Sequence, residues 1–201
     1  MNRLETWMMV NPVREAVQRW YAGPLLRRLG GTVEGSRVLE IGCGHGVGVD
    51  VILGQFGAAS VDAFDLDPGM VARARRRLER HGERVRLWEG SVTEITESDG
   101  TYEAVFAFGV LHHLPDWRAG LAQVRRVLKP GGRLFAEESY APFITHPMWR
   151  RLLHHPQEDR FDHEGLLTEL RTQHFRVRDQ RRMGDGLGWL VADKGTKLRR
   201  L

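Results

Sequence analysis

The chain has 201 residues, enough for one domain with a short extension. Its hydrophobic share of 41% and charged share of 28% are close to ordinary globular values, which excludes wholesale disorder and a fibrous repeat. The 30 basic and 26 acidic side chains leave a net charge of +4, a small excess for a dedicated nucleic-acid binder. The single cysteine, Cys43, excludes an internal disulfide and a multi-cysteine zinc site.

Membrane and export signals are also missing from the pattern. The longest apolar run, Ala104 to Leu111, is far shorter than the about 18 residues that a membrane-spanning helix needs. Glu5, Asn11 and Arg14 interrupt the N-terminal apolar residues before the core of a signal peptide can form. We therefore expect no transmembrane segment and a cytoplasmic location.

Residues 1–30 stand apart from the pattern that follows, and we expect them to form an N-terminal helical cap. Asn2 and Asn11 are each placed as a helix N-cap. Gly23-Pro24 is expected to break the second helix. One face of that helix would carry Val13, Val17, Trp20 and Tyr21. Three roles remain open for this segment: capping a pocket, packing on the core, or lying on a membrane surface.

From Arg37 onward, β-rich runs alternate with helical patterns, which predicts an α/β fold with a doubly wound, Rossmann-like sheet of seven strands in residues 31–201, with helices on both faces. The expected strands are Arg37–Ile41, Ser60–Phe64, Arg84–Trp88, Ala104–Phe108, Gly132–Glu137, Phe175–Arg181 and Leu187–Ala192. The expected helices lie near 46–56, 68–81, 116–129 and 163–173. Only five residues separate the last two strands, too few for a helical crossover, so the mostly parallel sheet should end in an antiparallel C-terminal strand.

Two of these helices carry boundary signals. Asp67-Pro68 reads as an N-cap followed by a first-turn proline. Pro130-Gly131-Gly132 is expected to end the helix near 116–129. The helix near 68–81 carries a run of charge that indicates a solvated face: Arg73, Arg75, Arg76, Arg77 and Arg80.

A glycine-rich turn follows the first strand directly, in the segment VLEIGCGHGVG of residues 38–48. Gly42, Gly44 and Gly46 permit positive φ angles and remove the Cβ atoms that would keep a ligand away from the backbone. Asp65 ends the next strand 23 residues after Gly42, where a carboxylate can accept hydrogen bonds from both hydroxyls of a ribose. The combination indicates a nucleoside cofactor.

The spacing of the turn narrows the choice of cofactor. A dinucleotide fingerprint would need glycine at position 47 or 49, and both are valine. The loop has no lysine and therefore is not a P-loop for ATP. Glu40, just before the turn, would repel a pyrophosphate but could hold an ammonium group, such as the one that S-adenosylmethionine carries.

These motifs resemble those of the class I S-adenosylmethionine-dependent methyltransferases, in particular small-molecule enzymes of the ubiquinone-biosynthesis type. The resemblance covers about residues 36–139 and, more loosely, continues to 193. Its motifs are VLEIGCGHGVG (38–48), VDAFDLDPGM (61–70), YEAVFAFGVLHHLPD (102–116) and LKPGGRL (128–134). It implies S-adenosylmethionine as the cofactor.

The resemblance also implies where each part of the cofactor lies. The methionine end would be held by Glu40, Gly42, Cys43 and Gly44. Asp65 would bind the ribose, and Leu66 and Met70 would line the adenine side. The family usually presents an acid to the adenine amino group after the third strand, whereas this chain departs from the pattern with Ser91-Val92, so the contact passes to the Val92 backbone and to Ser91. Phe108 and Gly109, after the fourth strand, would lie against the cofactor.

The acceptor side requires alignment more than chemistry, because transfer of a methyl group from a sulfonium is an in-line displacement. A base, where one is needed, should come from the carboxyl ends of the fourth and fifth strands. We predict Glu138 and His113 as catalytic residues, with shaping of the cofactor pocket as the alternative role for His112-His113. Glu137 and Glu138 point to opposite faces of their strand, so one must face the pocket, unless the pair caps the next helix.

Tyr21, Tyr140 and His146 are predicted to line the acceptor site. The segment that contains His146 also carries His154, His155 and His163, and it should form part of the acceptor wall. No metal site is predicted, because these histidines lack the spacing that would place ligands on one helical face.

Absent motifs restrict the acceptor. The fourth strand is not followed by the N/D-P-P-Y/F/W motif of many exocyclic-amine enzymes. Carbon-5 methylation of pyrimidines needs a cysteine nucleophile, and the only cysteine lies in the cofactor loop. All three lysines, Lys129, Lys194 and Lys197, are poorly placed for ribose methylation. We therefore predict a small-molecule acceptor and no nucleic-acid partner. Two alternatives stay open: an enzyme docked on membrane through residues 1–30 that methylates a lipid headgroup amine or a quinone, and a non-catalytic cofactor-binding protein.

Overall fold

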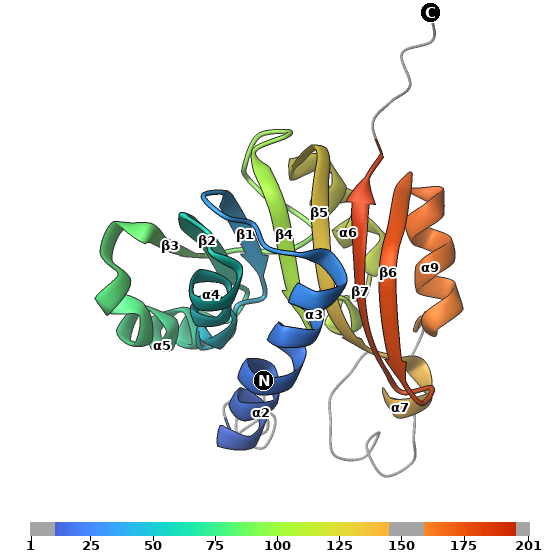
Figure 1. Cartoon of the computed structure of the whole chain (residues 1–201), viewed down its shortest axis with the longest axis horizontal. Helices are drawn as coiled ribbons and strands as arrows, with labels where there is room; N and C mark the ends of the chain where they lie inside the picture. Colours follow the sequence, from blue (N-terminus) through green and yellow to red (C-terminus); the bar gives the residue numbers. More distant parts are fainter. Residues whose placement is uncertain (1–10, 145–158, 196–201) are drawn as a thin grey trace, which may run out of the picture.

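A computed structural model describes residues 11–144 and 159–195 and contains one seven-stranded sheet (Figure 1). The strand order is β3-β2-β1-β4-β5-β7-β6. The strands are β1 (Arg37–Ile41), β2 (Ser60–Asp65), β3 (Val85–Glu89), β4 (Tyr102–Phe108), β5 (Leu128–Ser139), β6 (Phe175–Met183) and β7 (Leu187–Lys194). Strands β1 to β5 pair in parallel, and β7 lies between β5 and β6, antiparallel to both. The predicted doubly wound fold with an antiparallel C-terminal strand is confirmed.

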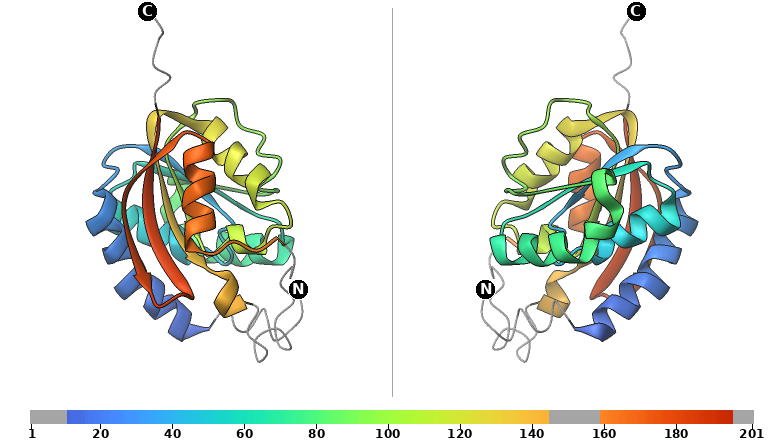
Figure 2. Two further views of the ribbon diagram at one scale, coloured as in Figure 1. Left: turned by 90° about the vertical axis from the view of Figure 1, so that its right-hand side faces the viewer. Right: turned by 90° about the vertical axis from the view of Figure 1, so that its left-hand side faces the viewer.

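Helices cover both faces of the sheet (Figure 2). They are α2 (Pro12–Val17), α3 (Gly23–Gly30), α4 (Val47–Val51), α5 (Pro68–Leu78), α6 (Trp117–Val127), α7 (Ala141–Ile144) and α9 (His163–Thr172), with short π or 3-10 turns η1 (Gln18–Ala22), η2 (Ile52–Phe56), η3 (Glu79–Arg84) and η4 (Leu111–His113). No helix in the described ranges is long and apolar enough to cross a membrane.

Two buried clusters follow from the alternation of side chains along the strands. Leu39 and Val105 point to one face, where they pack with residues of α6 and α9. Val38 and Phe106 point to the other face, where they pack with residues of α3, α4 and α5. We call these the α6 face and the α4 face. Every side chain at the carboxyl ends of the strands belongs to one face or the other, and this decides what it can reach.

The N-terminal segment differs from the prediction, because Gly23-Pro24 does not break it. Asn11 caps α2 by accepting a hydrogen bond from the Arg14 N–H at 2.9 Å, and the helical path then continues to Gly30. The π turn η1 stands immediately before the Gly-Pro pair. A proline inside a helix removes one hydrogen bond and clashes with the carbonyl four residues earlier, and a wider turn at that point relieves the clash. The predicted helix start at Asn2 lies outside the described residues.

Two boundaries show how well local signals predict the elements. Asp67 caps α5, with its Oδ1 accepting the Gly69 N–H at 2.7 Å, as expected. Helix α6 ends at Val127, before the Pro-Gly-Gly sequence that was predicted to stop it, and β5 begins at once. Lys129 precedes a proline and therefore avoids the helical conformation, so the helix ends earlier in the sequence than predicted. The Pro-Gly-Gly residues fall in the irregular start of β5, where the register against β4 shifts.

Candidate active site

The glycine turn after β1 has one open position and two packed ones. Gly42, Gly44 and Gly46 all have positive φ angles, of 60°, 52° and 88°. A Cβ atom on Gly42 would lie 2.6 Å from Val110, and one on Gly46 would lie 2.7 Å from Leu78. Around the corresponding point on Gly44, no atom of the described residues lies within 4 Å, apart from those of Gly44 and its two chain neighbours. The turn is thus packed at both ends, and its bare backbone is exposed to a ligand at Gly44.

Asp65 braces this turn from the end of β2. Its Oδ2 accepts a hydrogen bond from the Gly44 N–H at 2.8 Å, and its Oδ1 accepts one from the Asp67 N–H at 2.9 Å. Burial raises the pKa of the Asp65 carboxyl, although the two backbone donors oppose the rise. Each carboxylate oxygen has a further lone pair, so the group can bind ribose hydroxyls while it holds the turn.

Glu40 is buried directly beneath the turn, on the α4 face. A Cβ on Gly48 would lie 1.9 Å from Glu40 Oε1, so glycine at position 48 makes room for the carboxylate. Glu40 Oε2 has no hydrogen-bond partner among the described residues. Burial, together with Asp65 and Asp50, holds the pKa of Glu40 well above its ordinary value. A buried carboxylate with an unused oxygen is costly unless a donor or a cation binds there.

The other predicted cofactor residues lie around this edge of the sheet. The Cys43 N–H donates to the Phe64 carbonyl at 2.9 Å, and burial raises the pKa of its thiol. Met70 is buried on α5, whereas Leu66 is exposed. The Ser91 hydroxyl is hydrogen-bonded to Thr93, and the side chain of Val92 is buried. Phe108 is the last residue of β4, and Gly109 follows it directly.

Glu138 holds the loop that follows β4. Its oxygens accept hydrogen bonds from the N–H groups of Val110, Leu111 and His112, and its Oε2 also lies 2.7 Å from His112 Nδ1. Burial raises the pKa of Glu138 to about 8, although these backbone donors oppose the rise. The hydrogen bonds of this carboxylate therefore position the loop. Its predicted contact with the acceptor stays a prediction.

Glu137 points to the opposite face, and its carboxylate accepts fewer hydrogen bonds than that of Glu138. Its carboxylate is buried, with Oε1 3.7 Å from Arg14 Nη1, and its Oε2 has no hydrogen-bond partner in the described parts of the chain. Trp189 pairs with Glu137 across the β5–β7 ladder, and Tyr21 packs edge-on against Trp189 with ring centroids 5.2 Å apart. Sequence analysis missed Arg14 and Trp189, because only the tertiary fold brings them to β5.

The residues predicted to line the acceptor site do not gather in one place. Tyr21 lies on the α4 face and is partly exposed. Tyr140 is fully buried on the α6 face, with its hydroxyl 2.8 Å from His163 Nδ1. His113 is exposed, and its ring lies tilted by 37° against that of His112, with the ring centroids 4.2 Å apart. His146 lies outside the described residues.

Polar side chains of α2 and η1 hold the N-terminal helix across the carboxyl edge of the sheet. Arg14 donates a hydrogen bond to the Phe108 carbonyl at 3.2 Å. Glu15 contacts His45, in the glycine turn, at 2.8 Å, and it also pairs with Arg77 of α5. Arg19 donates to Asp50 of α4 at 2.8 Å. The N-terminal helix therefore lies beside both the glycine turn and the end of β4.

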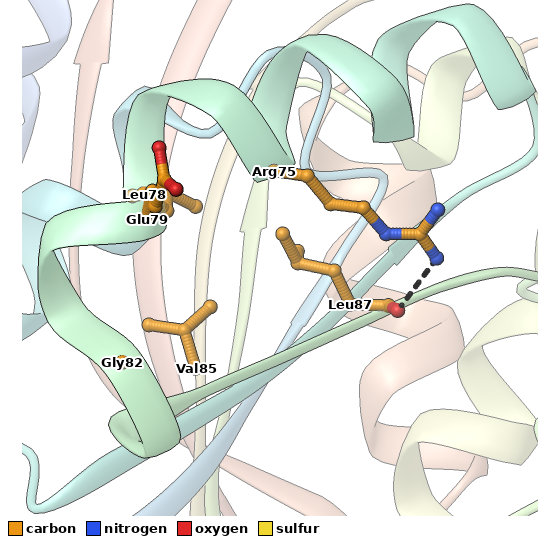
Figure 3. A pocket seen from close by; sticks show the side chains of 6 residues that line it. All are labelled: Arg75, Leu78, Glu79, Gly82, Val85 and Leu87. Atoms are coloured by element: carbon orange, nitrogen blue, oxygen red, sulfur yellow. Dashed lines mark hydrogen bonds between the residues drawn. The ribbon is translucent and has the colours of Figure 1, made fainter.

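Two pockets lie away from this edge. One of about 180 Å³ sits between α5 and β3 and is lined by Arg75, Leu78 and Val85, among others; Arg75 donates there to the Leu87 carbonyl (Figure 3). Another of about 560 Å³ lies between the start of α9 and the β6–β7 hairpin. Neither contains the carboxylates described above. No cluster of three or more metal-ligating side chains occurs within residues 11–144 and 159–195.

Comparison with known proteins identifies the fold and the domain. Residues 38–132 match the family model described as "Methyltransferase domain". Among solved structures, a chain in the complex between the Haloferax volcanii Trm112 methyltransferase activator and the putative methyltransferase superposes with a TM-score of 0.80 at 17% identity, covering 98% of this chain and 99% of that one. A putative methyltransferase from Bacillus halodurans C-125 gives 0.75 at 17% identity, covering 87% and 99%.

Curated relatives match over the same region. A fatty-acid O-methyltransferase of Mycolicibacterium smegmatis is 34% identical over 121 residues, which is 60% of this chain and 43% of that protein. A ubiquinone biosynthesis O-methyltransferase of Xanthomonas axonopodis pv. citri is 37% identical over 102 residues, 50% of this chain and 42% of that protein. The chain thus spans less than half the length of either relative. The comparisons thus assign a methyltransferase domain to residues 38–132, in agreement with the resemblance of the sequence motifs to class I S-adenosylmethionine-dependent methyltransferases.

Proposed function

We propose that this protein transfers a methyl group from S-adenosylmethionine to a small-molecule acceptor. The observation that carries the proposal is the unpartnered Oε2 of buried Glu40, next to the open backbone at Gly44. A cofactor with an ammonium group would satisfy that oxygen, whereas a pyrophosphate would be repelled by Glu40 and Asp65 together. The residues present therefore fit this cofactor and disfavour a dinucleotide.

Each part of the cofactor has a matching group on this edge. Glu40 would bind the ammonium group, Asp65 the ribose hydroxyls, and the backbone of residues 42–44 would lie along the methionine part. Leu66 and Met70, with Ser91 and the Val92 backbone, would border the adenine. When bound, S-adenosylmethionine supplies a methyl group on a positively charged sulfur. The protein then has to align the acceptor and exclude water.

Residues 1–30 would act as a cap over this site, and residues 31–201 as the methyltransferase domain. Support comes from the contacts of α2: Arg14 reaches the Phe108 carbonyl, and Glu15 reaches His45 in the glycine turn. A helix held there would limit access to the end of β4 and would favour a small acceptor. The names of the relatives, which refer to a fatty acid and to ubiquinone biosynthesis, also support a small-molecule acceptor. We place the protein in the cytoplasm, where a chain with one unpaired cysteine stays reduced.

Calorimetry and an acceptor screen test this function. S-adenosylhomocysteine, the product form of the cofactor, should bind to the whole protein, while NAD and ATP should not. Release of S-adenosylhomocysteine is then measured with S-adenosylmethionine and panels of phenols, alcohols, amines, thiols and carboxylic acids. Binding of NAD in place of S-adenosylhomocysteine contradicts the proposal. Tight binding without turnover on any acceptor class favours a non-catalytic cofactor-binding protein.

A membrane-surface enzyme is the second candidate, favoured by the outer face of the N-terminal helix. Val13 and Trp20 are 72% and 79% exposed, and Val17 lies on the same face. Arg27 and Arg28 are exposed farther along α3. An apolar face flanked by arginines suits an anionic lipid surface. Co-sedimentation with phosphatidylglycerol vesicles tests this candidate: Trp20→Ser should reduce binding, Met183→Ser on the β6–β7 hairpin serves as an exposed apolar control, and equal binding by both variants contradicts it.

A further inference from the structure

We propose that Glu137 binds the methyl acceptor and takes its proton, and that the acceptor is a molecule with a neutral hydroxyl group, an alcohol or a phenol. This inference rests on the proposed function. It differs from the sequence prediction, which gave the catalytic role to Glu138. It also restricts the acceptor class, because it disfavours carboxylic acids and aliphatic amines.

The first argument is the place of Glu137 in the sheet. Glu40 pairs in register with Phe106, and Phe108 pairs with Glu137. Side chains of paired positions, and of positions two apart, share a face of the sheet, so Glu40 and Glu137 both lie on the α4 face. The Glu137 carbonyl also accepts the Gly109 N–H at 2.7 Å. Glu137 thus stands two strands from Glu40, at the end of β4 where the cofactor's reactive end would lie.

Second, Glu137 Oε2 is buried and has no hydrogen-bond partner among the residues that the structure describes. The nearest cation, Arg14, lies 3.7 Å from Oε1, which is longer than a hydrogen bond. Burial raises the pKa of this carboxyl group, and the Trp189 indole that faces it opposes the rise. Neither Trp189 Nε1 nor Glu137 Oε2 has a hydrogen-bond partner of normal geometry in the described ranges. A buried carboxylate oxygen without a donor is unfavourable. A hydroxyl group of the acceptor would supply that donor.

The third argument is the local charge, which selects a neutral acceptor. Arg14 and Glu137 carry opposite charges and balance each other beside the end of β4. A carboxylate acceptor would meet the negative Glu137, and two carboxylates at close range cannot both stay ionised. An aliphatic amine is an ammonium ion at neutral pH, so it would meet Arg14 and would have no free electron pair. A hydroxyl group avoids both penalties.

The surrounding side chains suit an apolar body for such an acceptor. Tyr21 and Trp189 form an edge-to-face aromatic pair next to Glu137. Tyr21 is 42% exposed, whereas Trp189 is buried, so the pair leads from solvent toward the carboxylate. Aromatic walls bind planar apolar groups well.

The step that Glu137 would assist needs only the acceptor, S-adenosylmethionine and the Glu137 carboxylate. The acceptor oxygen uses one electron pair to form a bond to the methyl carbon, and the carbon–sulfur bond breaks with its electron pair left on sulfur. The hydroxyl proton moves to Glu137 Oε2. Burial raises the pKa of Glu137, although Arg14 opposes the rise, and a carboxylate with a raised pKa is a better base near neutral pH.

Glu103 offers a control away from this edge of the sheet. It lies at the amino end of β4 and, like Glu137, has a buried oxygen without a hydrogen-bond partner among the described residues. Glu137→Gln and Glu103→Gln therefore remove the same charge, one beside the proposed acceptor and one at the opposite edge of the sheet.

Fluorine NMR on the protein loaded with S-adenosylhomocysteine measures acceptor binding without turnover. The probes are para-fluorophenol and para-fluorobenzoate, which share a ring and differ in the polar group. We expect the wild type to prefer the phenol. Glu137→Gln should reduce that preference about tenfold or more, the equivalent of one hydrogen bond to a charged group, and Glu103→Gln should keep it. Tighter binding of the benzoate by the wild type, no saturable binding of the phenol, or an unchanged preference in Glu137→Gln overturns the inference.

The pH profile of methyl transfer to para-fluorophenol gives a second readout. If Glu137 must be ionised to take the proton, kcat/KM falls as the pH drops through its pKa, and Glu137→Gln loses that acid limb. Arg14→Met removes the cation that lowers this pKa, so the limb should move to higher pH; this variant also serves if Glu137→Gln does not fold. An acid limb unchanged in either folded variant overturns the inference. Loss of S-adenosylhomocysteine binding by the wild type would instead contradict the proposed function itself.

Discussion

The two sides of the sheet's carboxyl edge are built in different ways. The proposed cofactor side consists of Glu40, the turn at residues 42–46 and Asp65, all within one β-turn-α-β unit. The proposed acceptor side brings together Arg14, Glu137 and Trp189, from the N-terminal helix, the fifth strand and the last strand. One side is a local structure based on bare backbone. The other is an assembly of side chains that are distant in sequence.

This difference explains how changes should affect the protein. A local turn tolerates few substitutions, because its glycine φ angles and the bracing hydrogen bonds of Asp65 depend on one another. A tertiary assembly can change one side chain without disturbing its backbone. We expect variants on the cofactor side to lose cofactor binding, and variants on the acceptor side to change acceptor choice.

The largest effect should come from closing the open backbone position. Gly44→Val places a branched side chain where no described residue other than the two chain neighbours comes within 4 Å of the Cβ position, and where the cofactor would rest. We expect affinity for S-adenosylhomocysteine to fall about a hundredfold, or about 3 kcal/mol. Gly131→Val is the matched control, because Gly131 also has a positive φ, of 76°, with open space around its Cβ position. Equal loss of affinity in both variants, measured by calorimetry, would show that strain rather than occlusion is responsible.

Removing the charge of Glu40 should come next. Glu40→Gln keeps the shape but loses the attraction for an ammonium group, so affinity for S-adenosylhomocysteine should fall by about 1.5–3 kcal/mol. Binding of adenosine, which has no ammonium group, should not change. Glu103→Gln, at the amino end of β4, is the control for loss of a glutamate that also has a buried unpartnered oxygen. Similar losses for adenosine and S-adenosylhomocysteine would contradict the assignment of Glu40.

Asp65→Ala should weaken both ligands. The ribose hydroxyls lose their acceptor, at a cost of about 1–3 kcal/mol in affinity for S-adenosylhomocysteine and for adenosine alike. The N–H groups of Gly44 and Asp67 also lose their partner, so thermal stability should fall as well. Unchanged adenosine affinity in a folded variant would remove Asp65 from the ribose site.

A different kind of effect, on stability rather than on ligand affinity, concerns Glu138 and appears in the pH dependence of stability. Its folded-state pKa of about 8 lies above the ordinary value of 4.5, so the folded protein retains a proton that the unfolded chain releases. That contribution to stability is complete below 4.5 and is lost as the pH rises toward 8. Wild-type stability relative to Glu138→Gln should therefore decrease over this range in denaturant titrations at successive pH values. A flat difference contradicts the prediction.

Local sequence signals account for most of the fold and for the cofactor side. Asn11 and Asp67 cap their helices, and the glycines at 42–46 adopt the predicted backbone, because each depends on interactions a few residues away. The failures have tertiary causes. The π turn before Pro24 lets the helical path continue where the Gly-Pro pair was expected to break it.

The choice between Glu137 and Glu138 shows the same limit. Alternation along a strand says that the two side chains point apart, but not which face holds the acceptor. The register of β5 against β4 and β7 makes Glu138 a partner of the loop and places Glu137 beside Trp189 and Arg14. Tyr140, two residues after Glu138, lies on the face of the sheet away from Tyr21 and forms a hydrogen bond with His163. Spacing alone could not have separated these residues.

The position of β7 between β5 and β6 has a consequence for how the protein matures. Trp189 leaves the ribosome after Glu40, the glycine turn and Asp65, yet its strand pairs directly with the one that carries Glu137. A nascent chain can thus form the glycine turn and its hydrogen bonds to Asp65 well before Trp189 is in place. Under the proposed function, acceptor selectivity would emerge after cofactor binding during synthesis, and exchanging the β6–β7 hairpin offers a way to redirect it while leaving cofactor binding intact.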